Sequence, residues 1–250
     1  MTACSYCGAR MTASATFCAH CGQEVPGARE PLLLEPPPKP NFTDRVTLQG
    51  NNALRLLIVL LASLFGSAIF VGLFFDDTAS GMLFASVMLA IGTTLCALPE
   101  GKEIRMLFDP AAVGRLRPWL WAAVVTPLLP LAAMLWLTLI GMQDEAGGDA
   151  FGMSTWMAVL TICLFPGIFE ELAFRGVVFG NLRHMLTPRW AQVVTAALFA
   201  AVHFAPVIFP YHFLVGYFLG WLRVRGGNLV VPMFAHALHN AVVVFVYDAS

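Results

Sequence analysis

Charged residues are scarce in this sequence. Only 12% of its 250 residues are Asp, Glu, Lys or Arg, and 58% are hydrophobic, whereas an ordinary soluble domain has roughly 25% charged and 45–50% apolar residues. The composition therefore excludes an ordinary water-soluble globule. The formal net charge is −1, and so small a charge gives no general attraction to nucleic acid. We expect no nucleic-acid partner.

A secretory signal is also lacking at the start of the chain. Met1 is followed by a polar, cysteine-rich segment instead of a basic stretch and an apolar core. We therefore expect the amino terminus to stay in the cytosol. Composition divides the chain into three predicted parts, which are a cysteine-rich head (1–25), a proline-rich linker (26–50) and an apolar membrane domain (51–250).

Four of the six cysteines form two closely spaced pairs in the head. The pair Cys4 and Cys7 is followed by Gly8, and the pair Cys18 and Cys21 is followed by Gly22. Each such turn places two thiolates on a tight loop, and two loops complete a tetrahedral sulfur site. A segment of about 20 residues cannot bury enough core to fold without a staple such as a metal. The pattern predicts a zinc ribbon with structural zinc in a closed shell.

Other interpretations of the head and linker are weaker. Two disulfides or a redox dithiol are disfavoured because cytosolic thiols stay reduced. His20 is predicted to be a bystander, since four cysteinates already close the zinc shell. Six prolines between Pro26 and Pro40 favour an extended spacer over an SH3-type ligand. We expect the ribbon to be tethered to the membrane domain without packing on it.

The membrane domain reads as a series of apolar segments long enough to cross a bilayer, at roughly 17–25 residues per spanning helix. The seven segments are about 53–75, 80–99, 118–141, 151–182, 190–209, 211–223 and 229–247. The sixth is short and the fourth long, so an eighth, partial span or a re-entrant piece remains open. The sequence predicts an all-α, polytopic transmembrane helical bundle of about seven or eight spans.

Basic residues alternate from one side of the predicted bundle to the other. They occur before the first segment, between the second and third, after the fourth and after the sixth, and the other loops contain no Lys or Arg. By the positive-inside rule the basic loops and the amino terminus are cytosolic. A zinc ribbon joined to such a domain favours a bacterium, so we expect a multi-pass protein of the bacterial inner membrane.

The fourth and fifth segments contain ionisable residues that the apolar surroundings make costly. Glu170 and Glu171 are adjacent, and Arg175 follows Glu171 by four residues. On a helix Glu171 and Arg175 share a face and can pair, whereas Glu170 is turned roughly 100° away and can face a cavity. His203 is an isolated imidazole in the fifth segment. Pro166 is expected to kink the fourth helix beside the carboxylates.

The seventh segment has His236 and Asn240 one turn apart on one helix face. At about 1.5 Å rise per residue, Glu170, His203, His236 and Asn240 all lie roughly 16–22 Å from the nearest cytosolic arginine, which places them in one layer. A carboxylate beside an imidazole can activate water, and a second imidazole with a carboxamide can stabilise an oxyanion. The set predicts a hydrolase of the peptide-bond type. Cys163, in a purely apolar setting, is a poor nucleophile.

Glu170-Glu171-x-x-x-Arg175, Phe199-x-x-x-His203 and His236-x-x-x-Asn240, in this order, resemble the three motifs of the CPBP family. These are intramembrane glutamate-dependent endopeptidases related to the type II CAAX prenyl protease and to bacteriocin-processing and immunity proteins. The resemblance covers residues 150–247.

The resemblance implies that Glu170, assisted by His203, activates water, while His236 and Asn240 stabilise the oxyanion. It also implies that Glu171 and Arg175 hold the site by pairing. The family is often labelled metalloprotease, but no His-Glu-x-x-His motif is present, so a catalytic divalent metal remains open. In a metal site His239 could take the place of His236.

The leading hypothesis is an endopeptidase that cuts a membrane-associated peptide or protein, which could be lipidated, in the cytosolic half of the bilayer. A transporter or proton relay would spread its carboxylates across the membrane, and the single layer disfavours it. A non-catalytic binding or bacteriocin-immunity protein on the same fold remains an alternative.

Overall fold

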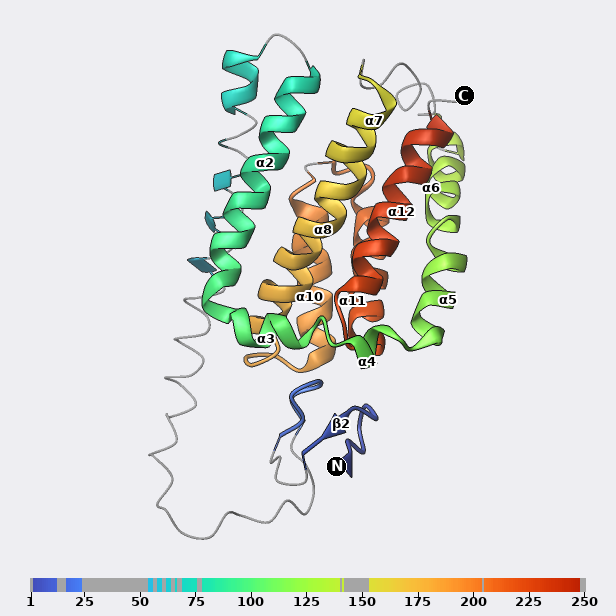
Figure 1. The fold of residues 1–250 in the computed structure, drawn as a ribbon. Helices are drawn as coiled ribbons and strands as arrows, with labels where there is room; N and C mark the ends of the chain where they lie inside the picture. The colour runs from blue at the N-terminus through green and yellow to red at the C-terminus, as the bar shows by residue number, and fades with distance from the viewer. Residues whose placement is uncertain are drawn as a thin grey trace.

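The computed structural model describes residues 2–12, 17–23, 78–139, 141, 153–203 and 205–247, with parts of 54–75. The predicted linker 26–50 and parts of the first apolar segment lie outside these residues. The described chain forms a helical bundle with a small cysteine-bearing unit at one end (Figure 1). The all-α fold class with an amino-terminal ribbon is therefore confirmed.

The elements follow one another as two short strands and a series of helices. They are β1 (Thr2–Ala3), β2 (Arg10–Met11), α2 (Thr78–Ala97), η1 (Leu98–Glu100), α3 (Gly101–Met106), α4 (Pro110–Val113), α5 (Leu116–Val125), α6 (Leu128–Leu139), α7 (Thr155–Ala158), η3 (Val159–Leu164), α8 (Phe165–Glu171), η4 (Leu172–Val178), α9 (Phe179–Leu182), α10 (Pro188–Ala201), α11 (Phe209–Gly226) and α12 (Val230–Tyr247).

Three helical stretches are long and apolar enough to cross a membrane, namely Ala79–Met106, Leu116–Leu139 and Thr155–Leu182. They coincide with the predicted second, third and fourth segments. A shorter apolar helix, Val230–Phe245, falls in the predicted seventh. The fifth segment appears as α10, whose 14 residues rise roughly 21 Å, less than the hydrocarbon thickness of about 30 Å. The connection from α10 to α11 is therefore expected to lie within the membrane.

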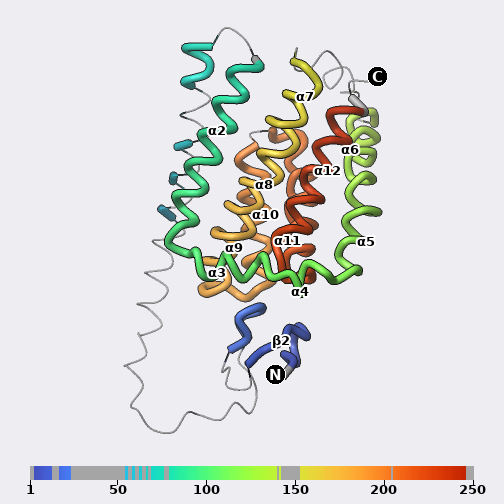
Figure 2. The backbone as a smooth tube through the Cα atoms, in the orientation of Figure 1, coloured from blue at the N-terminus to red at the C-terminus, as the bar shows by residue number. Residues whose placement is uncertain are grey.

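The fourth helix is continuous along its path but contains two π-helical turns, η3 and η4, on either side of α8 (Figure 2). The turn in η3 ends at Leu164, two residues before Pro166. This agrees with the expected irregularity at Pro166, because a proline cannot donate the helical hydrogen bond to the fourth residue before it. π-Helical turns are frequent at functional sites.

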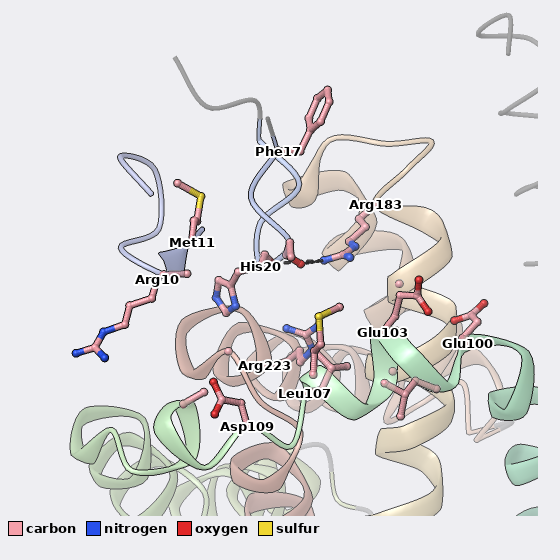
Figure 3. Close-up of a pocket in the computed structure, with 18 of the residues that line it drawn as sticks. Arg10, Met11, Phe17, His20, Glu100, Glu103, Leu107, Asp109, Arg183 and Arg223 are labelled. Atoms are coloured by element: carbon pink, nitrogen blue, oxygen red, sulfur yellow. Dashed lines mark hydrogen bonds between the residues drawn. The ribbon is translucent and has the colours of Figure 1, made fainter. Parts of the chain in front are cut away.

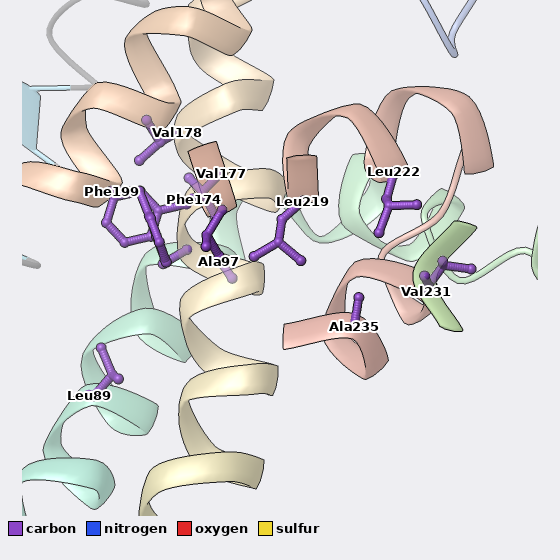
Figure 4. Packing of buried hydrophobic residues seen from close by; sticks show 13 residues of the cluster. Leu89, Ala97, Phe174, Val177, Val178, Phe199, Leu219, Leu222, Val231 and Ala235 are labelled. Atoms are coloured by element: carbon purple, nitrogen blue, oxygen red, sulfur yellow. The ribbon is translucent and has the colours of Figure 1, made fainter. Parts of the chain in front are cut away.

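The buried core is built from α2, α5, η4, α10, α11 and α12, and it includes Phe174, Phe199 and Leu219 (Figure 4). Two glycines permit close approaches between helices of the core. A Cβ on Gly167 would lie 2.9 Å from the Cβ of Ala237, and one on Gly216 would lie 2.9 Å from the Phe199 ring. These contacts bring α8 against α12 and α11 against α10, and thereby gather the polar residues of the three motifs.

The ribbon contacts the end of the bundle at which α9 ends and α11 turns into α12. Its strands pair antiparallel, with Thr2 opposite Met11 and Ala3 opposite Arg10. Arg183 and the carbonyl of Val224 both hydrogen-bond to ribbon residues. The expectation of a tethered ribbon that does not pack was therefore wrong. The packing of the ribbon could not be predicted from local sequence, because its partners in the membrane domain are about 160–200 residues away along the chain.

Candidate metal centre and active site

The four cysteines of the ribbon converge as predicted. Their sulfurs all lie within 4.8 Å of one another, with Cys4 3.7 Å from Cys21 and Cys7 3.6 Å from Cys18. A zinc tetrahedron with Zn–S bonds of about 2.3 Å has edges of about 3.8 Å, whereas a disulfide needs about 2.05 Å. The sulfur set therefore fits structural zinc, and the four thiols are free of disulfides.

Local backbone geometry prepares the two cysteine turns for a cation. Gly8 and Gly22 both have φ of 74°, which glycine adopts without strain. Burial opposes ionisation of the Cys4 thiol, but the backbone N–H groups of Tyr6 and Cys7 donate to its sulfur, and its pKa is lowered to about 7. Burial raises the pKa of Cys7 and of Cys21. A bound dication would supply the charge that stabilises all four thiolates.

His20 does not belong to the sulfur group, yet it is more than a bystander. Its Nε2–H donates to the carbonyl oxygen of Val224 at 3.1 Å. Arg183 Nη1 donates to the carbonyl oxygens of Ala19 and His20 at 3.4 and 3.3 Å. The ring covers Gly227, where a Cβ would lie 2.3 Å from His20 Cε1. The second cysteine turn thus packs against the turn that leads into α12.

A cavity of about 730 Å³ lies inside the membrane domain. Glu170 from α8, His203 after α10, and His236 and Asn240 from α12 all line it. Four predicted site residues from three separate helices therefore share one cavity. Apolar side chains form much of the remaining wall, including Leu137.

The two predicted supporting residues lie behind this cavity. Glu171 and Arg175 are both 0% exposed, and Arg175 Nη1 donates to Glu171 Oε1 at 2.8 Å. The same carboxylate oxygen accepts from His236 Nδ1 at 2.9 Å. Arg175 Nη2 donates to the carbonyl of Gly216 at 2.8 Å. Glu171 therefore links the arginine of its own helix to the imidazole of α12, which the sequence spacing alone did not predict.

Hydrogen bonds orient both predicted imidazoles through Nδ1. His203 Nδ1–H donates to the carbonyl oxygen of Phe199 at 2.7 Å, and His236 Nδ1–H faces Glu171. Nε2 is then the nitrogen that each ring offers to water or substrate. Glu170 contributes an unsatisfied acceptor, because its Oε2 is buried without a hydrogen-bond partner among the described residues. A buried acceptor of this kind calls for a donor such as water.

Three further polar residues of the cavity were not predicted as site residues. Tyr211 OH donates to His239 Nε2, and His239 Nδ1–H donates to Asn240 Oδ1 at 2.9 Å. The ring of His212 stacks on that of His203 with centroids 4.2 Å apart. Tyr211 and His212 stand at the start of a predicted span that contains no other polar ring until Tyr217, a signal that could have identified them.

The residues predicted to be catalytic do not form a cluster of metal-ligand atoms in the described part of the chain. Among the described residues, the cysteine group is the one in which three or more ligand atoms approach within 4.8 Å. The carboxylate of Glu170 and the imidazoles of His203 and His236 do not meet this condition.

Comparison with known proteins agrees with this architecture. Residues 152–242 match the family described as "Type II CAAX prenyl endopeptidase Rce1-like", and residues 1–25 match a zinc-ribbon domain. An Escherichia coli protein named "Uncharacterized 24.3 kDa protein" is 25% identical over 169 residues, which cover 66% of this chain and 76% of that protein. No solved structure matched.

The chain thus carries an Rce1-like CAAX prenyl endopeptidase domain and an amino-terminal zinc-ribbon domain. The first of these supports an intramembrane protease of the CAAX type. The predicted resemblance to the type II CAAX prenyl protease is confirmed at the level of the domain.

Proposed function

We propose that this protein is an intramembrane endopeptidase in which Glu170, with His203, activates a water that attacks a peptide bond. The observation that carries the proposal is the unpartnered Oε2 of Glu170, buried beside a cavity that His203, His236 and Asn240 also line. An active site needs such an acceptor for the proton of its water.

The proposed reaction moves one proton through Glu170. Its carboxylate takes a proton from water as the oxygen attacks the carbonyl carbon, and His203 Nε2 accepts a hydrogen bond from the same water. The carbonyl becomes an oxyanion in the tetrahedral intermediate. Glu170 then returns the proton to the departing amine nitrogen as the C–N bond breaks, leaving a new carboxyl group and a new amine.

The oxyanion is stabilised from α12. His236, when protonated, donates Nδ1–H to Glu171 and Nε2–H to the oxyanion, while Asn240 donates the second hydrogen of Nδ2. Arg175 already neutralises Glu171, so an imidazolium at position 236 offsets the charge of Glu170. Donors fixed in advance in a site with little water are worth far more than the same donors in solution.

The wall of the cavity suits an apolar ligand. Met82, Leu137 and Val243 line it beside the polar groups, as expected for a hydrophobic peptide segment or a lipid-modified one. We propose that the bilayer is a bacterial inner membrane and that the ribbon faces the cytosol, because the basic loops lie on the ribbon side.

With this orientation, we propose a depth of cleavage that differs from the one expected from the sequence. The connection Ala205–Ile208 lines the cavity and joins α10 and α11 at their ends away from the ribbon. Glu170 precedes Arg183, a ribbon contact, by 13 residues (183 − 170), or roughly 20 Å of helix. The cavity then lies in the half of the membrane farther from the cytosol, not in the cytosolic half.

Comparative peptidomics tests the proposal. Membranes from cells that express the wild type should contain cleavage products that Glu170→Gln and His203→Ala abolish while insertion and abundance stay normal. His184→Ala is a matched control, because His184 is an exposed histidine outside the membrane cavity. Unchanged products with Glu170→Gln would refute the hydrolase and favour non-catalytic peptide capture on the same fold.

A further inference from the structure

A large cavity separates the ribbon from the membrane domain (Figure 3). Its volume is about 810 Å³, and its walls come from the ribbon, from α3 and α9, and from the ends of α11. It is distinct from the membrane cavity, because the two share no lining residue. Neither the motifs nor the proposed hydrolysis explains it.

The wall of this cavity contains a buried cation that has no acceptor within the described ranges of the chain. Arg223 is 2% exposed, and its Nε has no hydrogen-bond partner among the described residues. Throughout the described part of the chain, its guanidinium takes part in no hydrogen bond or ion pair, and it lies over the Phe179 ring with Cζ 5.8 Å from the ring centroid. Burial of an unpaired charge is costly, so this group calls for an anion.

The carboxylates around the cavity do not supply that anion. Glu100 Oε1 accepts from Asn181 Nδ2, and Asp109 Oδ1 accepts from the backbone N–H of Ala111 at 3.0 Å. Glu103 is exposed, and it forms no ion pair with Arg223 in the described residues. Each acid that lines the cavity therefore has another partner or faces solvent.

Further positive charge surrounds the same space. Arg115 and Arg183 line it together with Arg223. Arg183 gives Nη1 to the ribbon carbonyls, but its Nε is buried without a hydrogen-bond partner among the described residues. Figure 3 shows Arg223 and Arg183 on the membrane-domain side, with His20 of the ribbon between them and Arg10. Four arginines and three carboxylates line the cavity, so that its formal charge, without the histidines, is positive.

We propose that this cavity binds a phosphate group through Arg223, with Arg183 and Arg115 beside it. A guanidinium fork matches phosphate oxygens in geometry and charge. The three arginines belong to the basic side of the membrane domain, where phospholipid headgroups lie, and basic pockets between membrane helices bind such headgroups. The phosphate therefore comes from an anionic phospholipid whose headgroup inserts beneath the ribbon.

Thermal unfolding of the purified full-length protein tests the proposal. One arm adds inorganic phosphate, compared with sodium chloride of equal ionic strength. The other compares nanodiscs of phosphatidylcholine with phosphatidylglycerol against nanodiscs in which oleate supplies the same negative charge. Arg225→Gln is the matched control, because Arg225 is exposed on the same helix two residues away and does not line the cavity.

The proposal expects phosphatidylglycerol to raise the Tm of the wild type and of Arg225→Gln more than oleate does. It expects this difference to disappear in Arg223→Gln. Arg223→Lys keeps the charge but loses the forked guanidinium, and it should weaken binding about tenfold. It replaces Arg223→Gln as the test variant if Arg223→Gln does not fold. A shift with inorganic phosphate alone would identify free phosphate as the source. Equal shifts with oleate, equal shifts in the Arg223 variants, or no shift in either arm would overturn the site.

Discussion

The side chain of Asn240 donates Nδ2–H to the carbonyl oxygen of Ile162 at 2.8 Å. In an uninterrupted α-helix this carbonyl would accept from the residue four positions later, which is Pro166 and has no N–H. The proline thus leaves an acceptor open on the fourth helix, and the carboxamide of α12 occupies it. Asn240 is held between Ile162 and His239 with one Nδ2 hydrogen still available.

Pro166→Ala should reduce proteolysis although the substituted residue lies outside the proposed reaction. The new N–H would compete for the Ile162 carbonyl and release Asn240 from its fixed orientation. Asn240→Ala should lower kcat about 10²–10³-fold, as expected for the loss of one oxyanion donor, and Pro166→Ala should cause a smaller loss. Steady-state assays on an identified substrate measure both. Wild-type kcat in Pro166→Ala would show that this contact does not orient Asn240.

Tyr211→Phe should lower kcat by weakening the chain of hydrogen bonds that ends at Asn240. The variant leaves His239 Nε2 without the hydroxyl that donates to it, and an unsatisfied buried acceptor costs about 1–3 kcal/mol. Tyr217→Phe provides the control, because Tyr217 does not line the membrane cavity. Equal kcat values in the two variants would count against a positioning role for Tyr211.

Removal of the Arg175 charge should destabilise the fold more than removal of both partners of its ion pair. Arg175→Met leaves the carboxylate of Glu171 buried with only His236 beside it, at a cost of about 3–5 kcal/mol. The double variant Glu171→Gln/Arg175→Met should recover part of this loss. Unfolding in detergent micelles measures the coupling. If the double variant loses as much stability as Glu171→Gln and Arg175→Met lose together, the pair does not act as a unit.

Chelation of zinc should detach the ribbon from the membrane domain. Loss of the metal unfolds the second cysteine turn, which presents His20 to Val224 and the carbonyls of Ala19 and His20 to Arg183. Hydrogen exchange of the turn around Val224 should increase, and metal analysis should find one zinc per wild-type chain. Cys18→Ser should lose the zinc, while Cys96→Ser, outside the ribbon, should keep it. Unchanged exchange after chelation would contradict metal-dependent docking.

Local sequence patterns determine much of the architecture of this protein. The two cysteine turns, the apolar segments and the layer of polar residues depend on spacing along the chain and on the cost of charge in an apolar medium. For this reason the fold class, the zinc set and the four residues that share the membrane cavity could be predicted from sequence. Their catalytic roles remain predictions until cleavage is measured.

Contacts between distant segments could not be predicted in the same way. The bond from Glu171 to His236, the capture of the Ile162 carbonyl by Asn240, and the docking of His20 over Gly227 join helices or domains whose separation is set by packing. A sequence specifies which residues are costly to bury, because burial follows from composition and period. Only the tertiary structure decides which partner satisfies each of them, and Arg223 faces a cavity with no such partner among the described residues.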